Sequence, residues 1–146
     1  MACKLTRWTT PALALLLLGA ACRTTAPAAP QTDYCSKSPG VVDEAIVLRG
    51  GNVNAKSLEE GGDVDQAGYM TDLSVNCSGL FPAKDDAANR AKYKEGIPNA
   101  TYGVTSAKKI CQAGGYIATT PYEGHRYHCT VWHVKPATAA SLFTQY

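Results

Sequence analysis

The pattern of apolar and polar side chains predicts two strands in the first half of the chain. Residues 45–49 form a short apolar run that ends at Gly50-Gly51-Asn52, which is typical of a strand entering a turn. Residues 69–77 alternate, and the face expected to point into the core carries Tyr69, Thr71, Leu73, Val75 and Cys77. Residues 58–68, between these strands, are rich in Gly, Glu and Asp, so we expect an exposed loop there.

Two helices are expected next. Residues 84–95 are charged and rich in alanine, as in a short exposed helix. A second helix is expected to begin after Thr105 or Ser106, either of which can cap it, and to end at Gly114-Gly115. The stripe that would pack against a sheet consists of Val104, Ala107, Ile110 and Cys111.

The last third of the chain predicts a hairpin and a final helix. Residues 116–120 and 125–134 are expected to pair across a turn at residues 121–124, and Pro136 can open a helix. The apolar face of that helix would carry Ala139, Leu142 and Phe143. This order predicts an α+β fold, with an antiparallel sheet of about four strands and two or three short helices packed mainly on one face. The 146 residues show no internal repeat and allow one domain of ordinary size.

The amino terminus has the composition of an export signal. Lys4 and Arg7 precede an apolar run at residues 11–21 that closes with small residues, so residues 1–21 are expected to be a signal peptide. The run is shorter than the roughly 20 apolar residues that a membrane-spanning helix needs. We therefore expect an exported protein without a membrane span.

The end of this signal suggests a lipid anchor. Residues 18–22, Leu-Gly-Ala-Ala-Cys, resemble the lipobox of bacterial lipoproteins, in which the cysteine receives diacylglycerol on its sulfur. Gly19 departs from the aliphatic residue usual at that position, and cleavage after Ala21 or Ala28 without lipidation is the alternative. Because Arg23 follows Cys22, the resemblance implies the outer membrane, facing the periplasm; a soluble periplasmic or secreted protein is the alternative. Residues 22–32 are rich in Pro, Ala and Thr and would form a flexible tether to a folded domain at residues 33–146.

Four cysteines remain in the folded part, and an even number in an oxidising compartment predicts two disulfides. Three pairings are formally open. Cys111 on the expected helix and Cys129 on a nearby strand both face inward, so we expect Cys111 to pair with Cys129 and Cys35 with Cys77. A zinc site is disfavoured, because neighbouring cysteines are 18 to 42 residues apart and none has Cys-x-x-Cys spacing.

Metal and catalytic sites are not evident in the sequence. If residues 125–134 form a continuous strand, His125 and His133 share a face about 26 Å apart and His128 points to the other face. No Gly-x-Ser-x-Gly motif is present, and adjacent acidic residues are expected to be solvated. We therefore predict no metal, no cofactor and no catalytic residue. A small hydrolase with dispersed site residues is kept as an alternative.

Charge is unevenly distributed along the chain. Without the two cations of the signal, 12 basic and 12 acidic residues remain, but residues 33–86 carry 10 acids against 4 bases and residues 87–146 carry 7 bases against 2 acids. If the halves form separate surfaces, an acidic side could attract a cationic protein partner through Glu59, Glu60, Asp63 and Asp65. If the strands interleave, the asymmetry cancels. No dense basic patch is present, so we expect no nucleic-acid partner.

The expected hairpin tip is the second candidate for partner binding. Aromatic and arginine side chains supply much of the energy at protein interfaces, and they gather here as Tyr122, Glu123, His125, Arg126, Tyr127 and, nearby, Trp132. Packing within the sheet is the alternative role of these aromatic rings.

These observations rank three functions. The first is a periplasmic binding lipoprotein that inhibits or neutralises another protein, such as a toxin or a cell-wall hydrolase. The second is a structural or accessory lipoprotein of an envelope or secretion assembly, and the third is the small hydrolase. The membrane would be contacted through the lipid anchor only, and nothing in the sequence indicates the oligomeric state.

Overall fold

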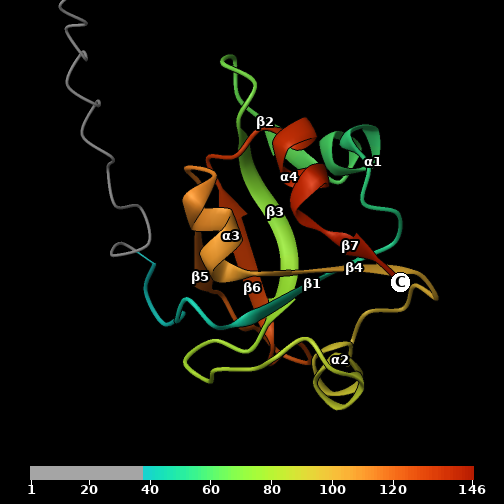
Figure 1. Cartoon of the computed structure of the whole chain (residues 1–146). Helices are drawn as coiled ribbons and strands as arrows, with labels where there is room; N and C mark the ends of the chain where they lie inside the picture. The colour runs from blue at the N-terminus through green and yellow to red at the C-terminus, as the bar shows by residue number, and fades with distance from the viewer. Residues whose placement is uncertain (1–37) are drawn as a thin grey trace, which may run out of the picture. The chain divides into compact units, whose positions relative to one another are not determined.

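The computed structural model describes residues 38–146 (Figure 1). The predicted signal peptide and tether, with Cys22 and Cys35, lie outside these described residues. Within them the chain has an α+β fold with a seven-stranded antiparallel sheet and four helices. Every strand pair is antiparallel, and the path across the sheet is β5-β6-β3-β1-β4-β7, with β2 pairing with β3.

The elements follow one another in the order β1 (Ile46–Gly50), α1 (Ala55–Glu60), β2 (Gly62–Val64), β3 (Met70–Cys77), α2 (Ala87–Tyr93), β4 (Tyr102–Ser106), α3 (Ala107–Gln112), β5 (Tyr116–Thr119), β6 (His128–Trp132), α4 (Pro136–Leu142) and β7 (Thr144–Gln145). The expected α+β class is confirmed, but the expectation of about four strands is too low. The expected exposed loop at residues 58–68 is also wrong, because α1 and β2 occupy part of it. Asn54 caps α1 by accepting from the backbone N–H of Ser57, and Leu58 is fully buried.

The alternation seen in the sequence holds only for part of β3. Leu73, Val75 and Cys77 are buried as expected, whereas Thr71 is exposed and Met70 is buried instead. The pairing with β2 shifts at this point: Asp63 lies opposite Asp72, and the next pair joins Val64 to Met70. This β-bulge adds one residue to β3 and reverses which side chains face the core.

Apolar side chains cover both faces of the sheet. The larger cluster packs beneath α1, α3 and α4 and includes Leu58, Leu73, Ile110 and Ala139. The smaller cluster lies on the opposite face and joins Tyr93 of α2 to Ile46, Leu48 and Val104. Three of the four helices therefore cover one face, and α2 covers part of the other.

The structure corrects the expected disulfides. Cys77 bonds to Cys129, with Cα atoms 5.8 Å apart, so the expected pairs Cys111 with Cys129 and Cys35 with Cys77 are both wrong. The reason is the order of the strands: β3 and β6 are neighbours, Val75 lies opposite Cys129, and Cys77 is therefore its diagonal neighbour on the same face. Cys77–Cys129 is the one disulfide with both cysteines among residues 38–146, and Cys111 is also disulfide-bonded rather than a free thiol.

Candidate functional site

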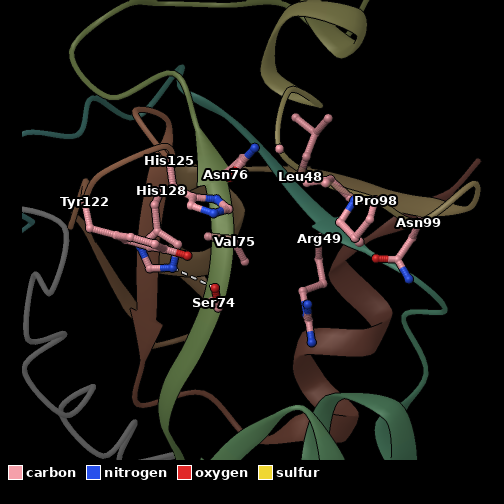
Figure 2. Close-up of a pocket in the computed structure, with 13 residues that line it drawn as sticks. Leu48, Arg49, Ser74, Val75, Asn76, Pro98, Asn99, Tyr122, His125 and His128 are labelled. Atoms are coloured by element: carbon pink, nitrogen blue, oxygen red, sulfur yellow. Dashed lines mark hydrogen bonds between the residues drawn. The ribbon is translucent and has the colours of Figure 1, made fainter.

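A small pocket opens on the sheet face opposite α1, α3 and α4 (Figure 2). We call it the sheet pocket. It has a volume of about 140 Å³, and side chains from β1, β3, β6, residues 96–99 and the β5–β6 connection line it. The side chains in this pocket that could take part in a reaction or bind a polar group are those of Ser74, His128, Tyr122 and His125. The pocket has room for a group of a few heavy atoms.

Two histidines meet at this pocket, contrary to the expectation from strand alternation. His128 donates its backbone N–H to the carbonyl of His125, and Tyr122 forms an isolated bridge with His125, so the chain turns here and β6 begins only at His128. The expectation of a continuous strand from residue 125 was therefore wrong. His125 stacks on the Tyr122 ring at 4.4 Å, and His128 meets the same ring edge-on at 4.9 Å.

His128 is held by hydrogen bonds at both ring nitrogens. Nε2 lies 2.7 Å from the hydroxyl oxygen of Ser74, and Nδ1 lies 2.9 Å from the carbonyl oxygen and 2.8 Å from the hydroxyl oxygen of Thr120. Sequence reasoning missed Ser74 and Thr120, because their proximity to His128 depends on the pairing of β3 with β6 and on the course of the β5–β6 connection. No group of three or more His, Cys, Asp or Glu side chains placed to hold a metal ion is present in residues 38–146.

The segment after α2 forms one wall of the sheet pocket, and Asn76 holds that segment in place. Its side chain is 6% exposed, and its amide nitrogen donates to the carbonyls of Tyr93 and Glu95 at 2.7 and 2.8 Å. These carbonyls lie at and just beyond the end of α2, where a helix leaves acceptors without partners in its own backbone. Asn76 therefore ties this segment to the middle of the sheet.

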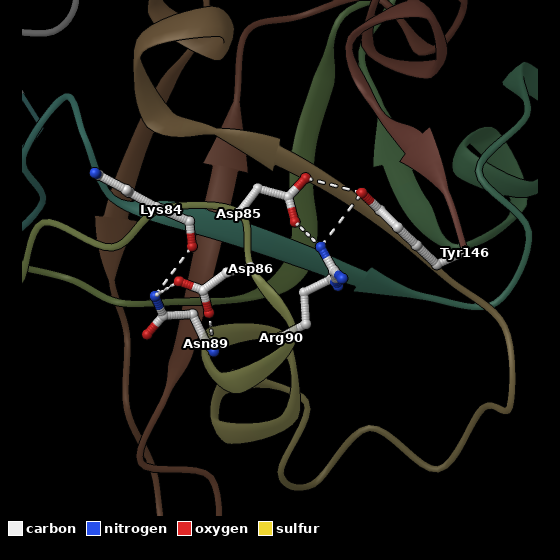
Figure 3. A network of polar contacts seen from close by, with 6 residues as sticks. All are labelled: Lys84, Asp85, Asp86, Asn89, Arg90 and Tyr146. Atoms are coloured by element: carbon white, nitrogen blue, oxygen red, sulfur yellow. Dashed lines mark hydrogen bonds and ion pairs between the residues drawn. The ribbon is translucent and has the colours of Figure 1, made fainter.

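A second set of contacts holds the other end of α2 (Figure 3). Asp86 caps the helix by accepting from the backbone N–H of Asn89 at 2.8 Å. Arg90 donates to Asp85 at 2.6 Å, and the hydroxyl of Tyr146 donates to the same carboxylate at 3.1 Å. The hydrogen bond to Asp85 raises the pKa of both Arg90 and Tyr146, since it stabilises their protonated forms. The chain's last residue is thereby joined to α2.

An exposed apolar loop lies beside the hairpin tip. We call residues 78–83 the Leu80 loop; Leu80 is 66% and Phe81 71% exposed. A groove of about 330 Å³ separates this loop from Pro121, Arg126 and Tyr127, and Cys77 and Cys129 also line it. We call it the tip groove.

The Leu80 loop is fixed at both ends. Gly79 accepts from the backbone N–H of Val42, and Ala83 donates its backbone N–H to Glu44, both at 3.1 Å. Within the loop, Ser78 donates its hydroxyl to the carbonyl of Phe81 at 2.6 Å. Gly79 has a φ of 60°, which favours glycine, and a Cβ atom there would lie 3.2 Å from Thr119. The loop thus holds its two apolar side chains outward on a defined backbone.

The other expected hairpin residues differ in their surroundings. Arg126 forms an exposed ion pair with Glu95, which raises the pKa of Arg126 chiefly through their hydrogen bond. Tyr127 meets the Tyr93 ring edge-on at 4.9 Å and therefore packs in the smaller cluster. Trp132 stacks on Tyr116 at 5.2 Å, at the opposite end of β6 from His128. Glu123 is exposed in the turn.

The acidic candidates lie at a different place from the hairpin tip. Glu59 and Glu60 end α1, and Asp63 lies opposite Asp72 in β3. Asp72 is about 17 Å along β3 from Cys77, which lines the tip groove. Asp65 accepts from two backbone N–H groups and so shapes its own turn. The sheet order also places strands from the second half of the chain on both sides of β1 and β3. The strands of the two halves of the chain are therefore interleaved, which is the arrangement expected to cancel the charge asymmetry between the halves.

Arg49 is a half-buried cation on β1. Its Nε atom is buried without a hydrogen-bond partner, and its guanidinium lies against Gly61 at the end of α1. In Figure 2 its side chain points away from Tyr122 and the two histidines. Burial lowers the pKa of Arg49, because desolvation disfavours its charged form.

Comparison with known proteins adds no relative. No family model, curated protein or solved structure matches the chain. Within the described residues, no helix is long and apolar enough to cross a membrane.

Proposed function

We propose that this chain is an exported binding protein that inhibits or neutralises another protein. The supporting observation is the Leu80 loop, which presents Leu80 and Phe81 with 66% and 71% of their surface in water. Large apolar side chains held together in water indicate an interaction site. The bound partner would be a toxin or a cell-wall hydrolase whose cleft the loop enters, with Cys22 lipidated and the domain facing the periplasm from the outer membrane.

The fixed backbone of the loop favours binding by steric plugging. Ordering a flexible loop costs free energy on association, and a loop already held by hydrogen bonds at Val42, Glu44 and Ser78 avoids much of that cost. Pro121, Arg126 and Tyr127 form the opposite wall of the tip groove and provide further contacts. The proposed contact surface is therefore the tip groove together with the Leu80 loop.

The test compares variants of the tagged full chain in affinity capture from envelope extracts. Burying an apolar side chain of this size contributes about 1.5–3 kcal/mol, so removing two of them in Leu80→Ala/Phe81→Ala is expected to weaken binding by about 150-fold or more. Glu59→Gln/Glu60→Gln is the matched control and is expected to bind as the unmodified chain does. The captured protein should lose its own activity when the unmodified chain is added.

The outcomes separate the alternatives. A partner that keeps its activity in the complex would contradict inhibition and support an accessory role in an envelope assembly. Loss of binding in the Glu59/Glu60 variant alone would place the contact surface at the acidic residues that end α1, and would support a cationic partner. For the anchor, Cys22→Ser is expected to abolish labelling by a fatty-acid analogue, and unchanged labelling would contradict lipidation at Cys22.

A further inference from the structure

Ser74 and His128 face each other on the sheet face opposite α1, α3 and α4, within the sheet pocket. In the pairing of β3 with β6, Ser74 lies opposite Thr130 and His128 opposite Asn76, so Ser74 and His128 are diagonal neighbours on one face. Their side chains approach to 2.7 Å between Oγ and Nε2 (Figure 2). Ser74 is exposed, so its hydroxyl is accessible to a molecule that enters the pocket.

The contacts of the imidazole favour one tautomer of the neutral ring. Nδ1 lies 2.9 Å from the carbonyl oxygen of Thr120, which can only accept, and 2.8 Å from the Thr120 hydroxyl, which can accept or donate. We assign the proton to Nδ1, because that tautomer lets this nitrogen donate to the carbonyl. The lone pair of the neutral ring is then on Nε2, which accepts from the Ser74 hydroxyl. A serine whose proton points at a histidine nitrogen, with the other nitrogen fixed by an acceptor, has the arrangement of an activated nucleophile.

The surroundings hold this imidazole in place. The Tyr122 ring meets it edge-on at 4.9 Å, and the Thr120 hydroxyl, itself 2.8 Å from the hydroxyl of Thr130, lies 2.8 Å from Nδ1. Tyr122 and His125 also line the pocket, and both side chains carry groups that can donate a hydrogen bond. The volume of about 140 Å³ matches a short acyl group.

We infer that Ser74 and His128 form a nucleophile and base pair that hydrolyses esters of short acyl groups. Ser74 Oγ bonds to the ester carbonyl carbon while its proton moves to Nε2 of His128. The tetrahedral intermediate collapses by breaking the carbon–oxygen bond to the alcohol, which takes that proton and leaves an acylated Ser74. Water then gives a proton to Nε2 and attacks the acyl carbon; the bond to Oγ breaks, Oγ takes the proton, and the carboxylic acid departs.

The test measures hydrolysis of p-nitrophenyl acetate by the full chain. Ser74→Ala and His128→Gln are each expected to lower the rate above buffer by about 100-fold or more, the lower end of what a positioned base contributes. Ser141→Ala and His133→Asn are matched controls at residues outside the sheet pocket and are expected to keep the rate. Asparagine suits position 133 because His133 has a φ of 59°. The acetyl ester should be cleaved faster than the octanoyl ester.

A second measurement identifies the reacting atom independently of turnover. A fluorophosphonate probe should label the peptide that contains Ser74 in the unmodified chain and in both control variants, and fail to label the folded His128→Gln variant. Circular dichroism confirms that each variant is folded. A rate equal to that of buffer, an unchanged rate in Ser74→Ala, or a label on another residue would each overturn the inference.

Discussion

Replacing Asn76 by aspartate should strongly destabilise the fold and make its stability depend on pH. The amide nitrogen of Asn76 donates to the carbonyls of Tyr93 and Glu95 at 2.7 and 2.8 Å from a site that is 6% exposed. An ionised carboxylate of the same shape has no donor, so both contacts become repulsive. Two lost hydrogen bonds at about 1 kcal/mol each, with the cost of a buried charge, predict a loss of at least about 3 kcal/mol at pH 7.

The pH dependence follows from the protonation state of the introduced carboxyl. Only the protonated form can donate to one of the two carbonyls, so folding raises its pKa above the value of about 3.9 expected in the unfolded chain. The protonated form therefore loses least: relative to the unmodified chain, the deficit is smallest below about pH 3.9. The deficit grows as the pH rises through the folded-state pKa.

Urea unfolding of Asn76→Asp, followed by circular dichroism at several pH values between 4 and 8, measures this deficit. Asn52→Asp is the matched control, because Asn52 is exposed and the substitution adds the same charge. The control should stay within about 0.5 kcal/mol of the unmodified chain. A loss below about 1 kcal/mol at pH 7, or a deficit that does not change with pH, would refute the role assigned to Asn76.

Three further predictions concern stability and use the same unfolding measurement. Cys77→Ala/Cys129→Ala should lose about 4 kcal/mol on the chain-entropy model, because the bridge spans 52 residues of sequence; an unchanged unfolding midpoint would exclude this disulfide. Leu58→Ala should lose about 2–5 kcal/mol because Leu58 is the fully buried side chain of α1, and a loss near zero would mean that α1 does not pack on the core. Arg49→Met should leave stability unchanged or raise it by about 1 kcal/mol, since it removes a half-buried charge with an unpaired Nε; a large loss would reveal a stabilising contact of the guanidinium.

The candidate sites were only partly predictable. Tyr122, His125 and Arg126 were selected for their residue types at an expected hairpin tip, and the structure places them at the sheet pocket or the tip groove. The Leu80 loop was missed, because an exposed Leu-Phe pair looks the same in sequence as a buried one. The contact between Ser74 and His128 joins residues 54 positions apart and depends on strand register.

Local signals determined several elements in the sequence itself. Ser106 caps α3 by accepting from the backbone N–H of Lys109, and Pro136 opens α4, as side-chain chemistry at helix starts predicts. The apolar run of β1 follows from burial of both of its faces, and the alternation of Leu73, Val75 and Cys77 in β3 follows from burial of one face. These elements depend on interactions within a few residues, so their sequence is enough to indicate them.

Only the tertiary structure decided the remainder. β4 is a strand because it pairs with β1, and β7 is a strand because it pairs with β4. In the same way, β2 depends on its pairing with β3. The same pairing brings β3 beside β6, which sets the Cys77–Cys129 bond and aligns Ser74 with His128. Such contacts depend on which distant segments become neighbours, and a shift of one residue in register would turn every side chain of a strand to the other face.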